Sequence, residues 1–197
     1  MIRVMVHEKY SKLNLGSGTV LDHQFPLPWL NVDIEANDSG YRCDVISLPT
    51  DWTERFREVR ASHVLEHIFL EDWDAALAEW VRVLAPHGVI RIIVPDLEIV
   101  VRDLVRGFDD KGRSALSTIE TTPVLAQIYG AGYGSRQTEE RWRHRIIVSK
   151  QMLGEAMLRR GLTDIRVYNR LDDPAASLGI RDDSQNMFSL RMLAIKE

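Results

Sequence analysis

Two glycines and one carboxylate form the pattern in this sequence that is best suited to binding a ligand. Gly16 and Gly18 follow a short apolar run at 12–15, and Asp33 ends a second apolar run. Glycines at a strand exit let the backbone turn sharply and let a ligand approach main-chain N–H groups. A carboxylate at the tip of the next strand can accept hydrogen bonds from both hydroxyls of a ribose. The spacing indicates a nucleoside-containing cofactor across adjacent strand ends, although the glycine pair alone also fits a tight turn.

Length and composition indicate an ordinary globular protein. The chain has 197 residues, of which 45% are apolar and 27% charged, and its net charge is −4. This length predicts one domain over residues 1–197, and the charge favours neither nucleic acid nor an anionic membrane as a partner. The lone Cys43 excludes an internal disulfide and is typical of a reducing compartment. With no signal-peptide pattern and no membrane-spanning run, we expect a soluble, cytoplasmic protein.

The apolar pattern predicts the elements that position these residues. Strands are expected at 12–15, 29–34, 41–45, 58–62, 89–94, 165–168 and 187–195, and helices at 69–85, 95–105 and 149–161. Strands that alternate with helices predict an α/β fold around a mostly parallel sheet. Few residues separate Gly18 from Trp29, and Pro26 and Pro28 are among them, so little room remains for a crossover helix.

The ordered motifs carry a family resemblance over roughly half of the chain. They are Leu13-Asn14-Leu15-Gly16-Ser17-Gly18, Asn31-Val32-Asp33, Asp44 with Leu48-Pro49, Ser62-His63-Val64-Leu65-Glu66-His67, Glu79-Trp80-Val81-Arg82-Val83-Leu84 and Arg91-Ile92-Ile93-Val94-Pro95-Asp96. In this order they resemble the class I S-adenosylmethionine-dependent methyltransferases, most closely a small type 11-like branch linked with polysaccharide modification. The resemblance implies a Rossmann-like seven-stranded sheet, mostly parallel with an antiparallel last strand, with helices on both faces. It also implies S-adenosylmethionine as the cofactor.

The resemblance assigns residues to the cofactor. Gly16 and Gly18 would lie under its methionine part, and Asp33 would bind the ribose hydroxyls. The implied cofactor-binding residues are Leu15, Gly16, Ser17, Gly18, Asp33, Ile34, Asp44, Val45, Ser62 and His63. Two positions depart from the common pattern: Val20 stands where longer motifs have a third glycine, and His87 stands in a turn usually read Pro-Gly-Gly. For Asp44, an Asx turn is an almost equally good explanation.

His63 is the expected catalytic residue. Methyl transfer is a direct displacement, so catalysis depends mainly on alignment and on the exclusion of water. A base is needed only for a hydroxyl or a protonated amine, and an imidazole titrates near neutral pH. The alternative is that His63 only hydrogen-bonds the backbone of its loop. We expect methyl transfer to a hydroxyl of a small-molecule or sugar-linked acceptor.

Other functions fit parts of the sequence. His63 to His67 match His-x-x-Glu-His, a zinc-peptidase pattern that needs both histidines on one helix. That hydrolase would leave Gly16, Gly18 and Asp33 without a role, so we expect no metal. A dinucleotide-dependent oxidoreductase would need the third glycine and the crossover helix. A non-catalytic module that keeps the fold and binds the cofactor or a partner is the remaining alternative.

The segment 107–145 is expected to form a lid on the acceptor side. It contains glycines beside Tyr129 and Tyr133, which suit a mobile segment with aromatic walls. It also contains Arg143, His144 and Arg145, and arginines hold phosphates or carboxylates by paired hydrogen bonds. We therefore expect His67, Tyr133, Arg143 and Arg145 on the acceptor side; a solvated helix face would explain the same charges.

Overall fold

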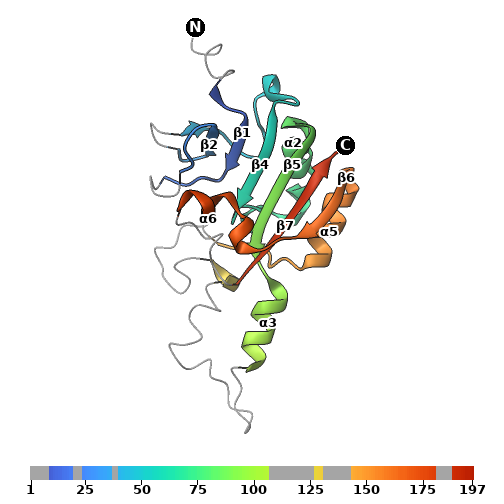
Figure 1. Cartoon of the computed structure of the whole chain (residues 1–197). Coiled ribbons are helices and arrows are strands. Elements are labelled where there is room, and N and C mark those ends of the chain that lie inside the picture. Colours follow the sequence, from blue (N-terminus) through green and yellow to red (C-terminus); the bar gives the residue numbers. More distant parts are fainter. Residues whose placement is uncertain (1–8, 20–23, 37–39, 107–126, 131–142, 181–187) are drawn as a thin grey trace.

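A computed structural model shows a twisted sheet with helices around it (Figure 1). The structure describes residues 9–19, 24–36, 40–106, 127–130, 143–180 and 188–197. Within them, seven strands form one sheet in the order β3-β2-β1-β4-β5-β7-β6. The first five strands are parallel, whereas β7 runs antiparallel between β5 and β6. The predicted fold class is confirmed, including the antiparallel last strand.

The strand and helix bounds follow the predicted pattern with local differences. The strands are β1 (Lys12–Leu15), β2 (Trp29–Asp33), β3 (Tyr41–Arg42), β4 (Phe56–Ser62), β5 (Leu84–Pro95), β6 (Leu162–Val167) and β7 (Ser189–Lys196). The helices of five or more residues are α2 (Trp73–Val83), α3 (Leu97–Arg106), α5 (Lys150–Arg159) and α6 (Pro174–Leu178). The hydroxyl of Ser149 caps α5 by accepting from the Met152 amide at 3.2 Å, as its sequence position predicts.

Three differences have local causes. β3 has two residues instead of five, because the Asp44 carboxylate accepts the Ile46 amide in a turn directly afterwards. The helix predicted at 69–85 begins with a 3₁₀ turn at Leu70–Asp72 and ends at Val83. β5 already begins at Leu84, and His87 adopts a φ of +59° within it, so the Pro-His-Gly turn bends a strand instead of stopping a helix.

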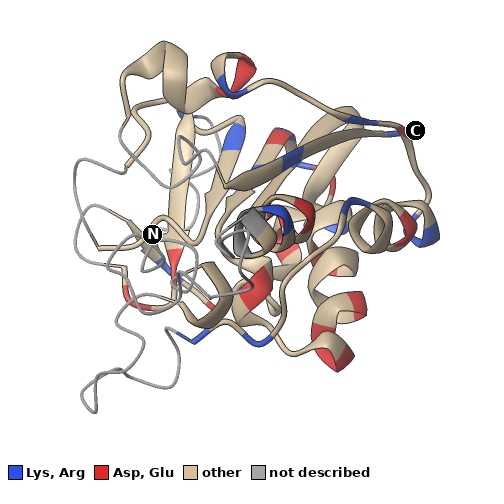
Figure 2. Ribbon diagram, turned by 90° about the horizontal axis from the view of Figure 1, so that it is seen from below, with Lys and Arg blue, Asp and Glu red and all other residues tan. Residues whose placement is uncertain are grey.

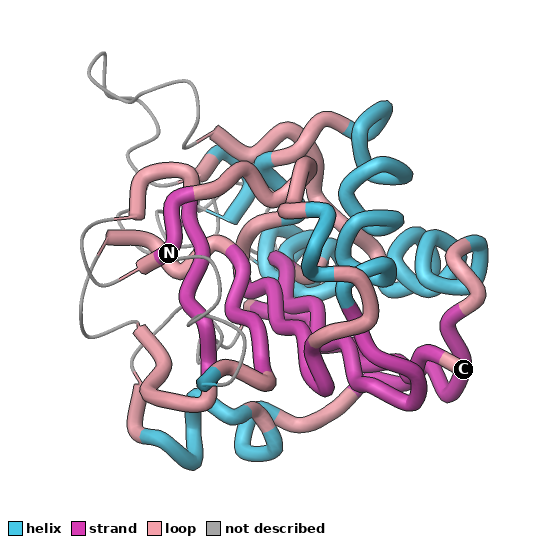
Figure 3. The backbone as a smooth tube through the Cα atoms, turned by 90° about the horizontal axis from the view of Figure 1, so that it is seen from above, coloured by secondary structure: helices cyan, strands magenta, loops and turns pink. Residues whose placement is uncertain are grey.

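The two faces of the sheet are covered differently. Figure 3 shows the longer helices on one side of the row of strands. On that face the strands present apolar side chains, among them Leu13, Val59 and Ile92, to the main core. The other face carries buried polar side chains: Asn14, Asn31, Glu58 and Arg60. Those side chains depend on specific partners, because a buried polar group is costly unless it is hydrogen-bonded.

Asp173 provides the main partner on the polar face. Its carboxylate lies 3.1 Å from Nη2 of Arg60, and both side chains are almost completely buried. It also accepts the Tyr168 hydroxyl at 2.7 Å and the Ala175 amide at 3.0 Å, which caps α6. Burial opposes ionisation of Asp173, but the Arg60 charge and these hydrogen bonds hold its pKa below the ordinary value. A buried ion pair thus joins α6 to the middle of the sheet.

The carboxyl ends of the parallel strands meet at the lower edge of Figure 1, where α3 extends from the sheet. The start of α3 is joined to the segment before α5, because the Leu97 amide donates to the Val148 carbonyl at 3.1 Å. In Figure 2, which views this edge from below, acidic and basic residues are interspersed over the described ribbon. No helix in the described ranges is long and apolar enough to span a membrane. Ligands of open α/β sheets bind outside this edge, so a ligand site is expected here.

Candidate functional site at the carboxyl edge of the sheet

The glycine loop and Asp33 lie together, as their spacing predicts. The Gly18 amide donates to Oδ2 of Asp33 at 2.8 Å, and the Glu35 amide donates to Oδ1 at 2.8 Å. The Ser17 amide is held by the Val32 carbonyl at 3.0 Å. A carboxylate offers about four acceptor sites, so two lone pairs of Asp33 remain beyond these amide bonds. Asp33 therefore fixes the loop and keeps acceptor capacity for two further donors.

The backbone conformations of Gly16 and Gly18 both favour glycine, and only at Gly16 is there also no space for a side chain. Their φ angles are +64° and +66°, in a region that residues other than glycine adopt only at a cost in conformational energy. A Cβ at Gly16 would overlap Cγ2 of Val64, whereas a Cβ at Gly18 would meet no atom within 4 Å. The loop is thus packed on one side against the segment after β4 and open on the other.

Gly16→Ala is expected to destabilise the fold more than Gly161→Ala. Both sites have positive φ, worth about 1–2 kcal/mol of strain, but only Gly16 has a neighbour in the way of the new methyl group. Denaturant unfolding of both variants measures the difference. Val64→Ala in the Gly16→Ala background should restore part of the loss because it removes the overlapping methyl group. Equal losses in the two single variants would contradict the close packing of Gly16.

Three further expected cofactor residues, Ile34, Asp44 and Val45, follow the ends of β2 and β3. Ile34 directly follows Asp33 and is 54% exposed, an unusual position for a large apolar side chain. The Cys43 amide donates to the Asp33 carbonyl at 3.1 Å, which ties the turn containing Asp44 and Val45 to the end of β2. Asp44 is exposed and its Oδ1 accepts the Ile46 amide at 3.0 Å. The Asx turn expected as an alternative at Asp44 is present.

His63 is the first residue after β4 and adopts a φ of +53°. Its Nδ1 lies 2.9 Å from Oε1 of Glu66, and its Nε2 lies 2.9 Å from Oγ of Ser189 on β7. Backbone strain of this kind in a non-glycine residue is concentrated at functional sites. Carboxylate, imidazole and hydroxyl also occur in this order in nucleophilic triads. Ser189 is only 4% exposed, however, so its hydroxyl anchors the ring and is poorly placed to attack a substrate.

Two polar side chains at this edge have oxygens without a described partner. Within the described residues, Oγ of Ser62 accepts and donates no hydrogen bond, and neither does Oε2 of Glu66. Burial opposes ionisation of Glu66, but the charge and hydrogen bond of His63 hold its pKa below the ordinary value. Burial likewise lowers the pKa of His144. The edge therefore brings the Glu66 carboxylate close to the His144 imidazole.

The acceptor-side residues are only partly described. Nδ1 of His67 lies 3.2 Å from the Arg143 carbonyl, and the Arg145 amide donates to the Glu66 carbonyl at 2.7 Å. The Arg145 guanidinium stacks over the ring of Phe69 at 4.6 Å. Tyr133 and most of the expected lid at 107–145 lie outside the described residues. The described residues 143–145 lie against the segment after β4.

The zinc-peptidase alternative fails on local geometry. Its pattern needs His63 and His67 on one α-helix, one turn apart. The structure has a 3₁₀ turn at Leu65–His67, and the positive φ of His63 places that residue outside any helix. Both ring nitrogens of His63 also face protein partners.

Sequence reasoning missed Ser189 and the part played by His144. Ser189 lies 126 residues after His63, and no local pattern marks it. In the sequence His144 is part of a basic run, and nothing in its spacing predicts a contact with His67. The ring centroids of these two histidines lie 4.9 Å apart. A separate open hollow of about 700 Å³ lies between α5 and β6, lined by residues such as Leu158 and Met192. It contains none of the expected site residues.

The fold matches several solved methyltransferase structures. It is similar to a possible histamine N-methyltransferase of Thermotoga maritima at 15% identity and TM-score 0.55, covering 100% of this chain and 86% of that one. It is also similar to a SAM-dependent methyltransferase from Archaeoglobus fulgidus at 14% identity and TM-score 0.54, covering 99% of this chain and 90% of that one. A third similar structure is the 1,6-didemethyltoxoflavin N1-methyltransferase of Burkholderia thailandensis, solved with S-adenosylhomocysteine. It has 16% identity and TM-score 0.52, covering 98% of this chain and 73% of that one. No protein-family profile and no curated protein sequence matches the chain.

These likenesses define the fold. With the strand order and the antiparallel β7, the chain has the Rossmann-like fold of the class I S-adenosylmethionine-dependent methyltransferases. At identities of 13–16% among the first matches, the likeness extends to the fold alone, and activity must be argued from the site.

Proposed function

We propose that the protein is an S-adenosylmethionine-dependent methyltransferase. The observation that carries this proposal is the pairing of Gly18 with Asp33 at the carboxyl ends of β1 and β2. It combines a loop that glycine keeps open with a carboxylate that retains two acceptor sites, the two features that a nucleoside-containing cofactor requires. When bound, S-adenosylmethionine supplies a methyl group on a positively charged sulfur.

The residues around the loop fit this cofactor. The open side of Gly18 would give the cofactor access to the backbone, and Asp33 would accept hydrogen bonds from the ribose hydroxyls. Exposed Ile34 and the turn of Asp44 and Val45 would hold the adenine. Leu15, Gly16 and Ser17 complete the loop, and Ser62 faces the same edge from β4.

His63 is proposed as the proton acceptor for a hydroxyl substrate. Glu66 at Nδ1 fixes the tautomer that leaves a lone pair on Nε2. In the structure Nε2 faces the Ser189 hydroxyl, and a substrate hydroxyl reaches it by displacing that group. Nε2 of His63 would then take the proton of the substrate hydroxyl, and bound S-adenosylmethionine would supply the methyl group.

The segment after β4 and residues 143–145 support a proposal for the acceptor class. Solved neighbours of this fold include a toxoflavin-precursor N-methyltransferase and a phosphoethanolamine N-methyltransferase, both with small-molecule substrates. Exposed Arg143, together with Arg145, could pair with a phosphate or carboxylate of an anionic or sugar-linked acceptor. Methylation of a hydroxyl on such an acceptor is the finer part of the proposal, and His67 and Tyr133 belong to the same side.

The proposal is tested by titrating the purified protein with S-adenosylhomocysteine and by incubating it with methyl-labelled S-adenosylmethionine and a panel of small anionic and sugar-linked alcohols. We expect one binding site per chain and transfer of label to at least one alcohol. Binding without transfer to any acceptor, including cell extract, would favour the non-catalytic module. Absence of binding would refute the proposal.

Replacing Arg143 and Arg145 together by alanine should spare cofactor binding and reduce turnover of an anionic acceptor. The expected change is in KM, by roughly 10-fold or more, since one charge-assisted hydrogen bond is worth about 1.5–3 kcal/mol. An uncharged acceptor, if the enzyme uses one, serves as the control because its KM should change little. An unchanged KM for the anionic acceptor would leave both arginines as surface residues.

A further inference from the structure

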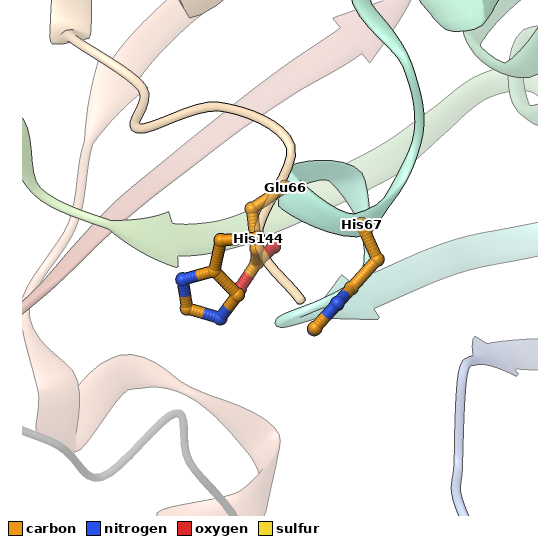
Figure 4. A group of neighbouring side chains, drawn as sticks. All are labelled: Glu66, His67 and His144. Carbon is orange, nitrogen blue, oxygen red and sulfur yellow. The ribbon is translucent and has the colours of Figure 1, made fainter. Parts of the chain in front are cut away.

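Three potential metal ligands from distant parts of the chain meet beside the proposed cofactor site. Glu66, His67 and His144 each offer a ligand atom, and these atoms all lie within 4.8 Å of one another. Figure 4 shows the Glu66 carboxylate with the His144 ring beside it and the His67 ring across from them. Glu66 and His67 belong to the turn after β4, whereas His144 comes from the segment before α5. The Arg145 amide, bonded to the Glu66 carbonyl, holds the two segments together.

In both histidines Nδ1 faces a backbone carbonyl oxygen. Nδ1 of His67 lies 3.2 Å from the Arg143 carbonyl, and Nδ1 of His144 lies 2.7 Å from the Gln127 carbonyl. A carbonyl oxygen can only accept, so in each ring Nδ1 carries the proton and Nε2 keeps its lone pair. Metal-binding histidines commonly have this arrangement, in which the second nitrogen donates to a backbone carbonyl and fixes the ring.

Glu66 supplies an independent reason to expect a cation. Its side chain is fully buried, and Oε1 lies 2.9 Å from Nδ1 of His63. In the part of the chain that the structure describes, Oε2 has no hydrogen-bond partner. An unsatisfied buried carboxylate oxygen is strongly unfavourable, and a coordinated cation would satisfy it. His63 would then be the outer partner that orients the carboxylate.

We propose that Glu66, His67 and His144 bind one divalent transition-metal ion. Two imidazole nitrogens and one carboxylate oxygen form a donor set that favours ions such as Zn²⁺, Co²⁺ or Ni²⁺ over Mg²⁺ or Ca²⁺. Ligand atoms around a tetrahedral ion lie about 3.3 Å apart. Side-chain rotations that move the ligand atoms by about 1.5 Å would therefore bring all three within binding distance of one ion. This proposal differs from the expectation of no metal, which concerned His63 and His67 as possible ligands. Here His144 takes the place of His63 as the second histidine.

Three protein ligands leave at least one coordination position for a substrate or water oxygen. If the proposed methyl transfer holds, this position would receive the acceptor hydroxyl and favour its ionised form, because a bound cation lowers the pKa of a coordinated oxygen. That role rests on the proposed function. Metal binding itself rests only on the three side chains.

The test is metal binding by the full chain after treatment with a chelator. Co²⁺ is titrated and followed by its visible absorption, and Zn²⁺ is titrated by calorimetry and counted by elemental analysis. We expect one ion per chain. His67→Ala and His144→Ala should each weaken Co²⁺ affinity by about 100-fold or more, since even outer-shell changes cost 10–100-fold. The matched control is His87→Asn, which replaces an exposed histidine by a residue that tolerates positive φ.

Circular dichroism establishes that each variant is folded, and His144→Gln is a second replacement if His144→Ala is unstable. Stoichiometric binding that is lost in the ligand variants and retained in His87→Asn supports the site. Absence of stoichiometric binding, or equal binding by all variants, overturns it. S-adenosylhomocysteine is titrated separately: its binding without metal would leave the proposed function standing, and metal binding without it would leave the metal site standing.

Discussion

Asp33→Ala is expected to weaken S-adenosylhomocysteine binding by about 10²–10⁴-fold. Asp33 would lose two charge-assisted hydrogen bonds to the ribose, each worth about 1.5–3 kcal/mol. It would also lose the bonds to the Gly18 and Glu35 amides, both 2.8 Å long, that hold the loop in place. Isothermal titration at 25 °C measures the dissociation constant directly.

Asp74→Ala is a suitable control for Asp33→Ala. Asp74 is a mostly exposed carboxylate on α2, paired with Arg160 at 2.9 Å and remote from the loop. Its removal should leave S-adenosylhomocysteine binding unchanged. Asp33→Asn keeps one acceptor oxygen and should fall between the wild type and Asp33→Ala. A dissociation constant for folded Asp33→Ala equal to that of the wild type would refute the ribose assignment.

Asp173→Ala is expected to lower the free energy of unfolding by about 3–5 kcal/mol. The substitution leaves the Arg60 guanidinium, 1% exposed, without its ion pair in the interior. For a chain of this length the loss corresponds to a fall in Tm of roughly 6–20 °C. Denaturant unfolding followed by circular dichroism measures the change. Asp74→Ala removes an exposed Arg–Asp pair of similar geometry and should have little effect.

Two further measurements separate the buried ion pair from a simple loss of packing. Arg60→Met combined with Asp173→Asn removes both charges, and this double variant should be more stable than Asp173→Ala. The pKa of Asp173 is lower in the folded than in the unfolded protein, where it is about 3.9. The ionised side chain therefore stabilises the fold above the unfolded pKa, and this stabilisation is lost as the pH falls through the folded pKa. Asp173→Ala should therefore lose less stability than the wild type on acidification to about pH 2. An Asp173→Ala variant as stable as Asp74→Ala would contradict this account.

The fold could be predicted from the sequence where patterns are local. The apolar runs before Gly16 and Asp33 identify β1 and β2, and Ser149 marks the start of α5 by its capping hydroxyl. Exact bounds were less predictable, because hydrogen bonds from other elements decide them. β4 begins at Phe56 instead of Glu58, since the Arg55 and Arg57 amides on either side of Phe56 donate to Val83 and Ser11. α6 was not predicted: five residues are too short to show a helical period.

The candidate site divides in the same way. Gly18 and Asp33 could be paired from the sequence because each follows a strand and parallel neighbours end at the same edge. The roles of Ser189 and His144 could not be predicted, since tertiary contacts alone bring them to His63 and His67. The positive φ of His63, +53°, was equally unpredictable, because the partners of its amide and ring, Ile93 and Ser189, are distant in the sequence.

The place of β7 between β5 and β6 has a consequence for how the chain acquires its structure. During synthesis, β1 to β5 can pair with one another once β5 has left the ribosome, because all of their neighbours except β7 have then been made. β6 cannot, since its described pairing is with β7, which is made after it. Until residues 189–196 emerge, the free edges of β5 and β6 are open to pairing with another chain. The interval between these two strands is therefore when the nascent protein is most exposed to aggregation.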